Sequence, residues 1–296
     1  GDVFAVAVAP GLKVTSPVEG WVLEAVAGYF AGPSDSPTLG AFGLSASSRQ
    51  GDVVWLDLIG DDGLRRIGRA DLTLSGLDID SEPALQPKDE GFTVDGVGNA
   101  VVAQLDSGWV TYFSGTEADV TSIGRATSAD GLVWDMDAEP LYSGIESWES
   151  VEVSPGSVQV LDDGSIRLWY TGTDGEDAKI GLLESTDGGE SFQPIAGDPY
   201  PWIFDSEAPG SWDDSGVRDP FVVTIDGIDH MWFSGSNGDS WQVGYATRAS
   251  DDETWLAATD PDGEPRPVLP LLSGSMRASG GSRSAVTTHG DHHPMP

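Results

Sequence analysis

Short apolar, aromatic-rich runs alternate along the chain with turns rich in Gly, Asp and Ser, and this pattern repeats. Three segments align over their whole length: 106–135, 162–192 and 226–255. Each has an aromatic-rich run ending in Gly, a loop, a second run opening with Ile-Gly or Val-Gly, and a closing turn before an aromatic residue. A fainter copy spans 51–79. A fixed period indicates one structural unit repeated along the chain.

A further run precedes each of the three clear copies and is apolar on both faces, as an inner strand packed between two neighbouring sheets requires. These runs cover 100–105, 157–161 and 221–225. A four-stranded sheet cannot bury both of its faces alone, whereas radial stacking of similar sheets buries them and leaves only short edges. The pattern therefore predicts an all-β propeller. Its repeat is marked by Gly68, Gly124, Gly181 and Gly244, separated by 56, 57 and 63 residues.

The two ends of the chain decide how the ring is completed. Residues 281–293 match 216–230, so a fifth inner strand begins close to the end of the sequence. The fifth blade is either truncated or completed by strand exchange with the N-terminal strands, which avoids a free sheet edge. Residues 1–80 form a first blade plus closing strands, or else a separate β-sandwich, and 81–296 hold the propeller blades. We favour ring closure, which gives a five-bladed β-propeller of four-stranded antiparallel blades.

The amino-acid composition limits the kinds of structure and of binding partner that we expect. With 39 Gly and 19 Pro, short strands and tight turns are favoured over helices. The 14 basic and 49 acidic residues give a net charge of −35, so we expect no nucleic acid partner. The absence of cysteine excludes disulfides, a thiolate nucleophile and a zinc ribbon. No apolar run approaches the roughly 18 residues of a membrane-spanning helix. We expect a monomer.

Three phrases carry a family resemblance: GSWDDSGVRDPFVV (210–223), DDGSIRLWYTG (162–172) and IGRATSADGLVW (123–134). Together they resemble the five-bladed propeller superfamily of arabinanases, levansucrases and invertases, that is, glycoside hydrolase families 43 and 32 and their relatives. The resemblance covers about residues 80–290. It implies a secreted bacterial protein, extracellular, periplasmic or at the cell surface, that acts on carbohydrate. It also implies a central pocket with three acids: a base or nucleophile, a transition-state stabiliser in an Arg-Asp-Pro motif, and a general acid.

Arg218-Asp219-Pro220 matches that motif. The resemblance therefore implies that Asp219 is the stabiliser and that Arg218 holds it ionised or binds a sugar hydroxyl. Hydrolysis needs two carboxylates roughly 5 to 9.5 Å apart, because one protonates the leaving oxygen while the other attacks or activates water. The missing acids are expected from loops before the inner strands, and the leading candidates are Glu149 and Glu207. The full set of candidates in these loops is Glu146, Glu149, Glu152, Glu207, Asp213 and Asp214.

The repeat also predicts which inner-strand positions face the pocket. Counting back from the turn after each inner strand places Asn99, Gly156 and Asp219 at equivalent positions, with Ser284 in the tail and 42–44 in the first copy. Only one of these positions carries an acid, which departs from the family pattern. The departure supports an alternative function: a non-catalytic propeller that binds glycan or protein at a cell surface.

Two of the lead-in segments share a Ser-Trp-acid core, at 147–149 and 211–213. Their tryptophans either present aromatic faces to sugar rings at the rim of the pocket or pack between the blades, which is the usual fate of Trp. The predicted substrate-binding residues are Arg218, Asn99, Trp148, Trp212 and Asp213.

The remaining motifs predict turns. STDGGESF (185–192) fits the Asp-box pattern, in which Asp187 hydrogen-bonds the hairpin backbone and the aromatic residue packs beneath. SADGLVW (128–134) is a shorter version. We expect no cofactor or metal. The tail histidines lack partners at ligand spacing, and the Asp-rich turns that could hold a structural Ca²⁺ lack an alternating oxygen-ligand loop. The tail histidines are His289, His292 and His293.

Overall fold

The computed structural model describes residues 41–268, except 51, 61, 74–75, 81, 198–199, 207–209 and 250–253. It also describes the backbone of four short strands between residues 7 and 31, and side chains from residue 52 onward apart from 72–77. In these residues all regular structure is β-strand, except one 3₁₀ turn, η1 (Ser147–Glu149). The all-β prediction is confirmed.

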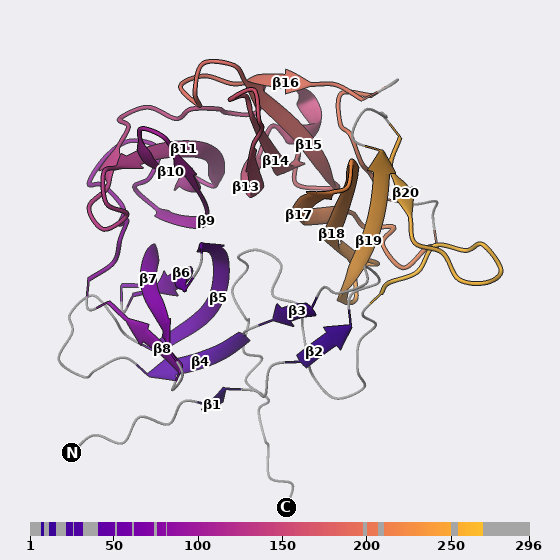
Figure 1. Cartoon of the computed structure of the whole chain (residues 1–296), viewed down its shortest axis with the longest axis horizontal. Coiled ribbons are helices and arrows are strands. Elements are labelled where there is room, and N and C mark those ends of the chain that lie inside the picture. Colours follow the sequence, from indigo (N-terminus) through magenta and orange to yellow (C-terminus); the bar gives the residue numbers. More distant parts are fainter. Residues whose placement is uncertain are drawn as a thin grey trace, which may run out of the picture.

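Four four-stranded antiparallel sheets follow one another in the part of the chain that the structure describes, and they are arranged around a common axis (Figure 1). The first strand of each sheet lies toward the axis, so each sheet is a propeller blade. The blades are β5 (Ala41–Gln50), β6 (Val53–Ile59), β7 (Arg65–Thr73) and β8 (Gly76–Ile79); β9 (Gly96–Leu105), β10 (Gly108–Glu117), β11 (Val120–Ser128) and β12 (Asp135–Met136); β13 (Glu152–Val160), β14 (Ile166–Thr173), β15 (Ala178–Ser185) and β16 (Gln193–Ile195); and β17 (Val217–Ile225), β18 (Ile228–Ser236), β19 (Trp241–Ala249) and β20 (Leu256–Ala257).

The N-terminal strands add to this ring. β4 pairs antiparallel with β5, and β1 pairs with β4. The β2–β3 hairpin lies between the first and fourth blades in Figure 1. The fifth inner strand predicted at 281–293 lies outside the described residues, so the number of blades and the division at residue 80 stay predictions. The N-terminal strands are β1 (Ala7–Val8), β2 (Leu12–Thr15), β3 (Val22–Ala25) and β4 (Ala27–Ala31).

At one end of the ring, the strand starts of neighbouring blades lie side by side. The start of a third strand lies beside the start of the next inner strand: Arg65 pairs with Gly96, and Thr121 pairs with Glu152, both parallel. At the third junction, a Cβ added to Gly216 would lie 2.8 Å from the backbone nitrogen of Ala178. Polar side chains at these strand starts are therefore gathered on one face of the molecule.

The hydrophobic cores lie between successive blades rather than inside one of them. Each core combines side chains from both flanking blades, as the two-sided apolar runs predict. The second strand contributes to both of its neighbours: Phe113 packs toward the first blade and Tyr112 toward the third. A blade therefore completes its core only when its neighbours are in place.

Ring packing explains the repeated glycines. In three blades the third-strand glycine pairs with an aromatic residue on the second strand, and any added Cβ would come closer than 3.0 Å to that ring. Glycine is required there because the ring lies flat across the neighbouring strand. The pairs are Phe113 over Gly124, Tyr170 over Gly181, and Phe233 over Gly244.

The Asp-box at 185–192 forms the predicted turn. Asp187 Oδ1 accepts hydrogen bonds from the backbone N–H of Glu190 (3.1 Å) and Ser191 (3.0 Å). Phe192 follows the turn, is 6% exposed, and packs edge-on against Tyr112 of the preceding blade with ring centroids 5.2 Å apart. The turn thus places the Phe192 ring between the second and third blades, where it packs them together.

We predict that Phe192→Ala lowers the free energy of unfolding by about 3–5 kcal/mol, because it empties a filled position between two blades. The control Ile195→Ala changes a side chain that is 38% exposed and should cost less than about 1 kcal/mol. Urea unfolding of both variants measures the difference. An equal loss of unfolding free energy in the two variants would contradict this packing role of Phe192.

Candidate functional site

A β-bulge interrupts the inner strands at one point, the position that the repeat marks as facing the axis. In the second blade Asn99 and Ala100 lie opposite Phe113, and in the fourth blade Asp219 and Pro220 occupy the corresponding place. Asn99 and Asp219 both have left-handed backbone, with φ of 51° and 54°. Asn and Asp adopt this conformation more readily than other non-glycine residues. Bulges re-aim side chains and are frequent beside active sites.

The register corrects the third-blade equivalence. Tyr170, the counterpart of Phe113, pairs with Pro155, so Pro155 rather than Gly156 corresponds to Asp219. The sequence alignment selects Gly156, one residue too far along the chain. Proline cannot adopt the positive φ of Asn99 and Asp219, so Pro155 does not resemble them in sequence. Gly156 has a packing role: a Cβ there would lie 2.5 Å from the carbonyl oxygen of Pro220.

The first-blade equivalence is also corrected. Ala46 pairs with Leu56 and Ser48 with Trp55, so the bulge follows Ala46. Residues 42–44 lie two to four positions before it, since they pair with β4 and not with the bulged part of β6. Ser284, the predicted tail equivalent, lies outside the described residues.

Polar contacts link the first blade to the second at the strand starts. Arg65 Nη2 donates to Asp57 Oδ2 (2.9 Å) and to Asn99 Oδ1 (3.2 Å). The backbone N–H of Asn99 donates to Asp57 Oδ1 at 2.8 Å. Asn99 Nδ2 then donates to Ser114 Oγ at 3.3 Å. Asp57 therefore holds both the side chain of Arg65 and the bulge of the next blade.

The same set of contacts continues to the fourth blade. Ser114 Oγ donates to Ser154 Oγ (3.1 Å), and Ser154 Oγ donates to Glu152 Oε1 (2.7 Å). Arg218 Nη2 donates to the same Glu152 oxygen at 3.0 Å, and Arg218 Nε lies 3.9 Å from Asp219 Oδ1. The result is one axial cluster, which we define as Asp57, Arg65, Asn99, Glu152, Arg218 and Asp219.

Asp219 and Arg218 each have one buried polar atom without a hydrogen-bond partner among the described residues. The backbone N–H of Asp219 donates to Thr171 Oγ1 at 2.9 Å, but Oδ2 is buried and has no hydrogen-bond partner among the described residues. Burial raises the pKa of the Asp219 carboxyl; the charge of Arg218 opposes this, and the charges of Glu152 and Asp57 add to it. The side chain is 34% exposed as a whole, so solvent and ligands reach it.

The structure brings three of the predicted site residues together. Asp219, Arg218 and Asn99 all belong to the axial cluster. Glu149, Asp213, Trp148 and Trp212 have their contacts elsewhere. Glu207 lies outside the described residues.

Glu149 is a buried anchor of η1. It is 1% exposed, and its Oε1 accepts hydrogen bonds from Tyr142 Oη (2.7 Å) and from the N–H of Ile145 (3.1 Å) and Glu146 (3.3 Å). Its Oε2 accepts from Tyr170 Oη at 2.6 Å. Burial raises the pKa of both tyrosines, and the Glu149 charge adds to it. These hydrogen bonds fix η1 to Tyr142, which bridges to the second blade, and to Tyr170 of the third blade.

The shared Ser-Trp-acid core has a packing explanation. Trp148 is 6% exposed and stacks at a tilt on Tyr170, and Trp212 does the same on Phe233. Asp213 is 1% exposed and accepts a hydrogen bond from Ser211 Oγ at 2.7 Å. In each of three blades one aromatic residue of the lead-in segment covers a second-strand glycine: Phe92 over Gly115, Trp148 over Gly172, and Trp212 over Gly235.

Sequence reasoning missed Asp57 and Arg65, and it ranked Glu152 behind Glu149 and Glu207 as a source of the missing acids. Asp57 is the single charged residue in the apolar strand VVWLDLI and is 8% exposed. A lone acid inside an apolar strand is a usable signal, because a buried charge needs a partner. Arg65 and Glu152 stand at strand starts next to polar turns, where charged residues are ordinary.

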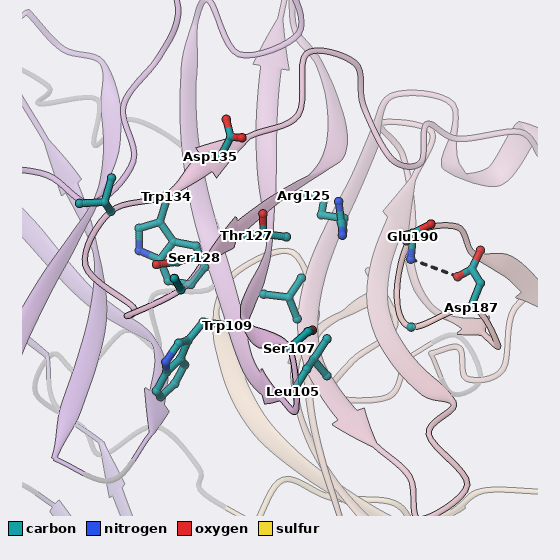
Figure 2. A pocket seen from close by; sticks show the side chains of 14 residues that line it. Leu105, Ser107, Trp109, Arg125, Thr127, Ser128, Trp134, Asp135, Asp187 and Glu190 are labelled. Carbon is teal, nitrogen blue, oxygen red and sulfur yellow. Dashed lines mark hydrogen bonds between the residues drawn. The ribbon is translucent and has the colours of Figure 1, made fainter.

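A surface cleft of about 730 Å³ lies at the other end of the second and third blades (Figure 2). It is lined by turn and strand-end residues such as Leu105, Ser107, Arg125 and Glu190, and by no member of the axial cluster. Figure 2 shows the Glu190 N–H bonded to Asp187 of the Asp-box on one of its walls.

Two findings on the described residues concern metals and membranes. No group of three or more His, Asp or Glu side chains in them is placed to hold a metal ion. Within the same part of the chain, no helix has the length and apolar character needed to cross a membrane.

Comparisons with known proteins identify the fold. No model of a known protein family matches the sequence, and no curated protein matches it. Solved structures do match, 119 chains in all. A glycosyl hydrolase from Bacteroides ovatus superposes with a TM-score of 0.57 at 16% identity, covering 76% of this chain and 70% of that one. A thermostable family-43 glycoside hydrolase gives 0.57 at 15%, covering 78% and 77%.

A third structure is described as "The GH130 family of mannoside phosphorylases contains glycoside hydrolases that target beta-1,2 mannosidic linkages in Candida mannan". It superposes with a TM-score of 0.60 at 15% identity and covers 88% of this chain and 85% of that one. At such identities the likeness concerns the fold. The chain has the all-β, propeller-type fold of these glycoside hydrolases, as the resemblance of its sequence motifs implies.

Proposed function

We propose that the protein binds carbohydrate at the axial cluster and hydrolyses glycosidic bonds there. One observation carries the proposal: carboxylates from three blades, Asp57, Glu152 and Asp219, converge with the guanidinium groups of Arg65 and Arg218. Propeller folds serve many functions, so the cluster supports this function and the fold alone does not.

Two of the three carboxyl groups in the cluster, those of Glu152 and Asp219, lie in different environments. Glu152 accepts hydrogen bonds from Arg218 and Ser154. The pKa of Asp219 is raised by burial, so it keeps its proton to a higher pH than an ordinary aspartate. Unequal carboxyl groups of this kind divide the roles of acid and base in glycoside hydrolysis.

We assign proton donation to Asp219 and base function to Glu152. Asp219 gives its proton to the glycosidic oxygen as the bond to the anomeric carbon breaks. Water adds to that carbon and passes a proton to Glu152, so atoms and charge balance. This role for Asp219 differs from the stabiliser role that the resemblance implies. Glu149 and Glu207 stay predictions for the acid, and the four hydrogen bonds held by Glu149 favour Asp219 over it.

Binding residues surround these two groups. The guanidinium of Arg218 lies 5.6 Å from the ring centroid of Trp241, and its Nε is buried without a hydrogen-bond partner among the described residues. Asn99 and Arg65 supply donors and acceptors for sugar hydroxyls on the other side of the cluster.

A second function, glycan or protein binding without catalysis, is favoured by one observation. Among the equivalent bulge positions only Asp219 is an acid, whereas Asn99 and Pro155 hold the others in the second and third blades. A binding module needs no second carboxylate. The catalytic assay below separates the two functions.

The acidic surface agrees with a monomeric protein that works outside the cytoplasm. A net charge of −35 keeps copies apart and repels nucleic acid. We propose an extracellular, periplasmic or cell-surface location and a carbohydrate partner. Fractionation of the natural source with an antibody against the chain tests this location.

We predict that Asp219→Asn and Glu152→Gln each lower kcat/KM by about 100-fold or more, because each removes a group that moves a proton. Aryl glycosides and soluble polysaccharides serve as substrates, with and without inorganic phosphate, since phosphorylases occur among the similar structures. Asp106→Asn, a change at an exposed residue in the turn between β9 and β10, is the control and should match the parent. A folded parent that is inactive on every substrate would favour the binding module.

We also predict that Asp219→Asn raises the melting temperature at pH 7. The folded-state pKa of Asp219 is raised, so its ionised form opposes folding above that pKa, and asparagine removes this cost. Below the ordinary pKa of 3.8 the parent is protonated in both states, and the difference disappears. Melting at pH 7 and pH 3 measures both points. A lower melting temperature for the variant at pH 7 would contradict the burial argument.

A further inference from the structure

Two aromatic rings stack face to face in the segment that follows β16 of the third blade. The centroids of Tyr200 and Trp202 lie 4.7 Å apart, and their planes differ by 4°. Tyr200 is 55% exposed. The indole supports one face of the phenol ring, and more than half of the tyrosine is open to solvent.

The pair is held rigid from behind. Trp202 contacts the buried Trp148 edge-on, with centroids 6.0 Å apart, and Lys179 Nζ lies 5.0 Å from the Trp202 ring centroid. Trp148 in turn packs into the core between the second and third blades. A ligand that stacks on Tyr200 therefore meets a preformed surface and orders few side chains.

The pair lies on the same face of the ring as the axial cluster. Phe204 bridges to Ile180, which places the segment after Trp202 along the start of β15. The first residue of β15, Ala178, adjoins Gly216, and Arg218 follows two residues later on β17. One long ligand can therefore reach from the axis of the ring to the edge of the third blade.

The surroundings of the pair suit a neutral sugar. Lys179 Nζ lies 3.6 Å from Asp205 and 3.9 Å from Asp177, so two carboxylates balance its charge and it attracts an anionic ligand only weakly. The net charge of −35 disfavours a polyanion. A specific protein interface buries about 1,000 Å² or more around an apolar centre, whereas here a single exposed ring stands among polar groups.

We propose that Tyr200 and Trp202 form a second carbohydrate contact, which binds a distal unit of a polysaccharide chain whose central unit occupies the axial cluster. This inference rests on the proposed function and makes its substrate polymeric. A sugar ring stacks its apolar C–H face on the open face of Tyr200, the face turned away from the Trp202 indole.

The test measures retention of the protein in native gels containing soluble arabinan, levan, β-mannan or rhamnogalacturonan. Tyr200→Ala should weaken retention by about 3- to 10-fold, the size expected for one lost stacking contact. Tyr200→Phe keeps the ring and should match the parent. Because Tyr200 is largely exposed, the alanine variant should keep the parent's melting temperature, and kcat/KM on a single-sugar aryl glycoside should be unchanged.

The outcomes separate the two proposals. Unchanged retention in Tyr200→Ala, equal loss in Tyr200→Phe, or a parent that no polysaccharide retains would overturn the distal contact, even if aryl glycosides are cleaved. Retention that depends on the Tyr200 ring in a parent that cleaves nothing would support the contact and overturn hydrolysis. A loss on aryl glycosides as large as on polymers would place Tyr200 outside a distal site and contradict the inference.

Discussion

The structure depends on one constraint: no blade can bury its own faces, so each must be packed on both sides by its neighbours. The second strand satisfies this constraint by sending aromatic residues in opposite directions, as Phe113 and Tyr112 show. Glycines on the third strand make room for these rings. Burial of large rings between sheets supplies the main driving force for stacking one blade on the next. Everything at the axis is positioned by this packing.

The axial cluster grows out of the same inter-blade contacts. A side chain on the second strand of one blade accepts a hydrogen bond from the bulge N–H of the next inner strand, Asp57 for Asn99 and Thr171 for Asp219. At each of these bulges, Asn99 or Asp219 turns its side chain toward the axis. The left-handed backbone conformation of these two residues is strained for a residue other than glycine. Buried charge and backbone strain thus gather at one place, which is where functional sites concentrate.

The sequence predicts what is local and periodic, and fails where side chains from different blades meet. The repeat, the Asp-box turn and the Arg218-Asp219 pair follow from spacing and motif. The register at Pro155 does not, because proline conceals the bulge. Glu149 is an acid in the predicted segment, but its carboxylate is bound by tyrosine hydroxyls. Asp57 and Glu152 reach the axis through contacts between residues that are 42 to 66 positions apart in the sequence. Only the folded ring reveals those contacts.

The central claim is that sugar binds at the axial cluster. A crystal structure of the Asp219→Asn variant with an oligosaccharide tests it most directly. The account predicts one sugar unit within hydrogen-bonding distance of residue 219 and Glu152, with Arg218 beside it. An oligosaccharide that occupies another surface and leaves the axis to solvent would contradict the account.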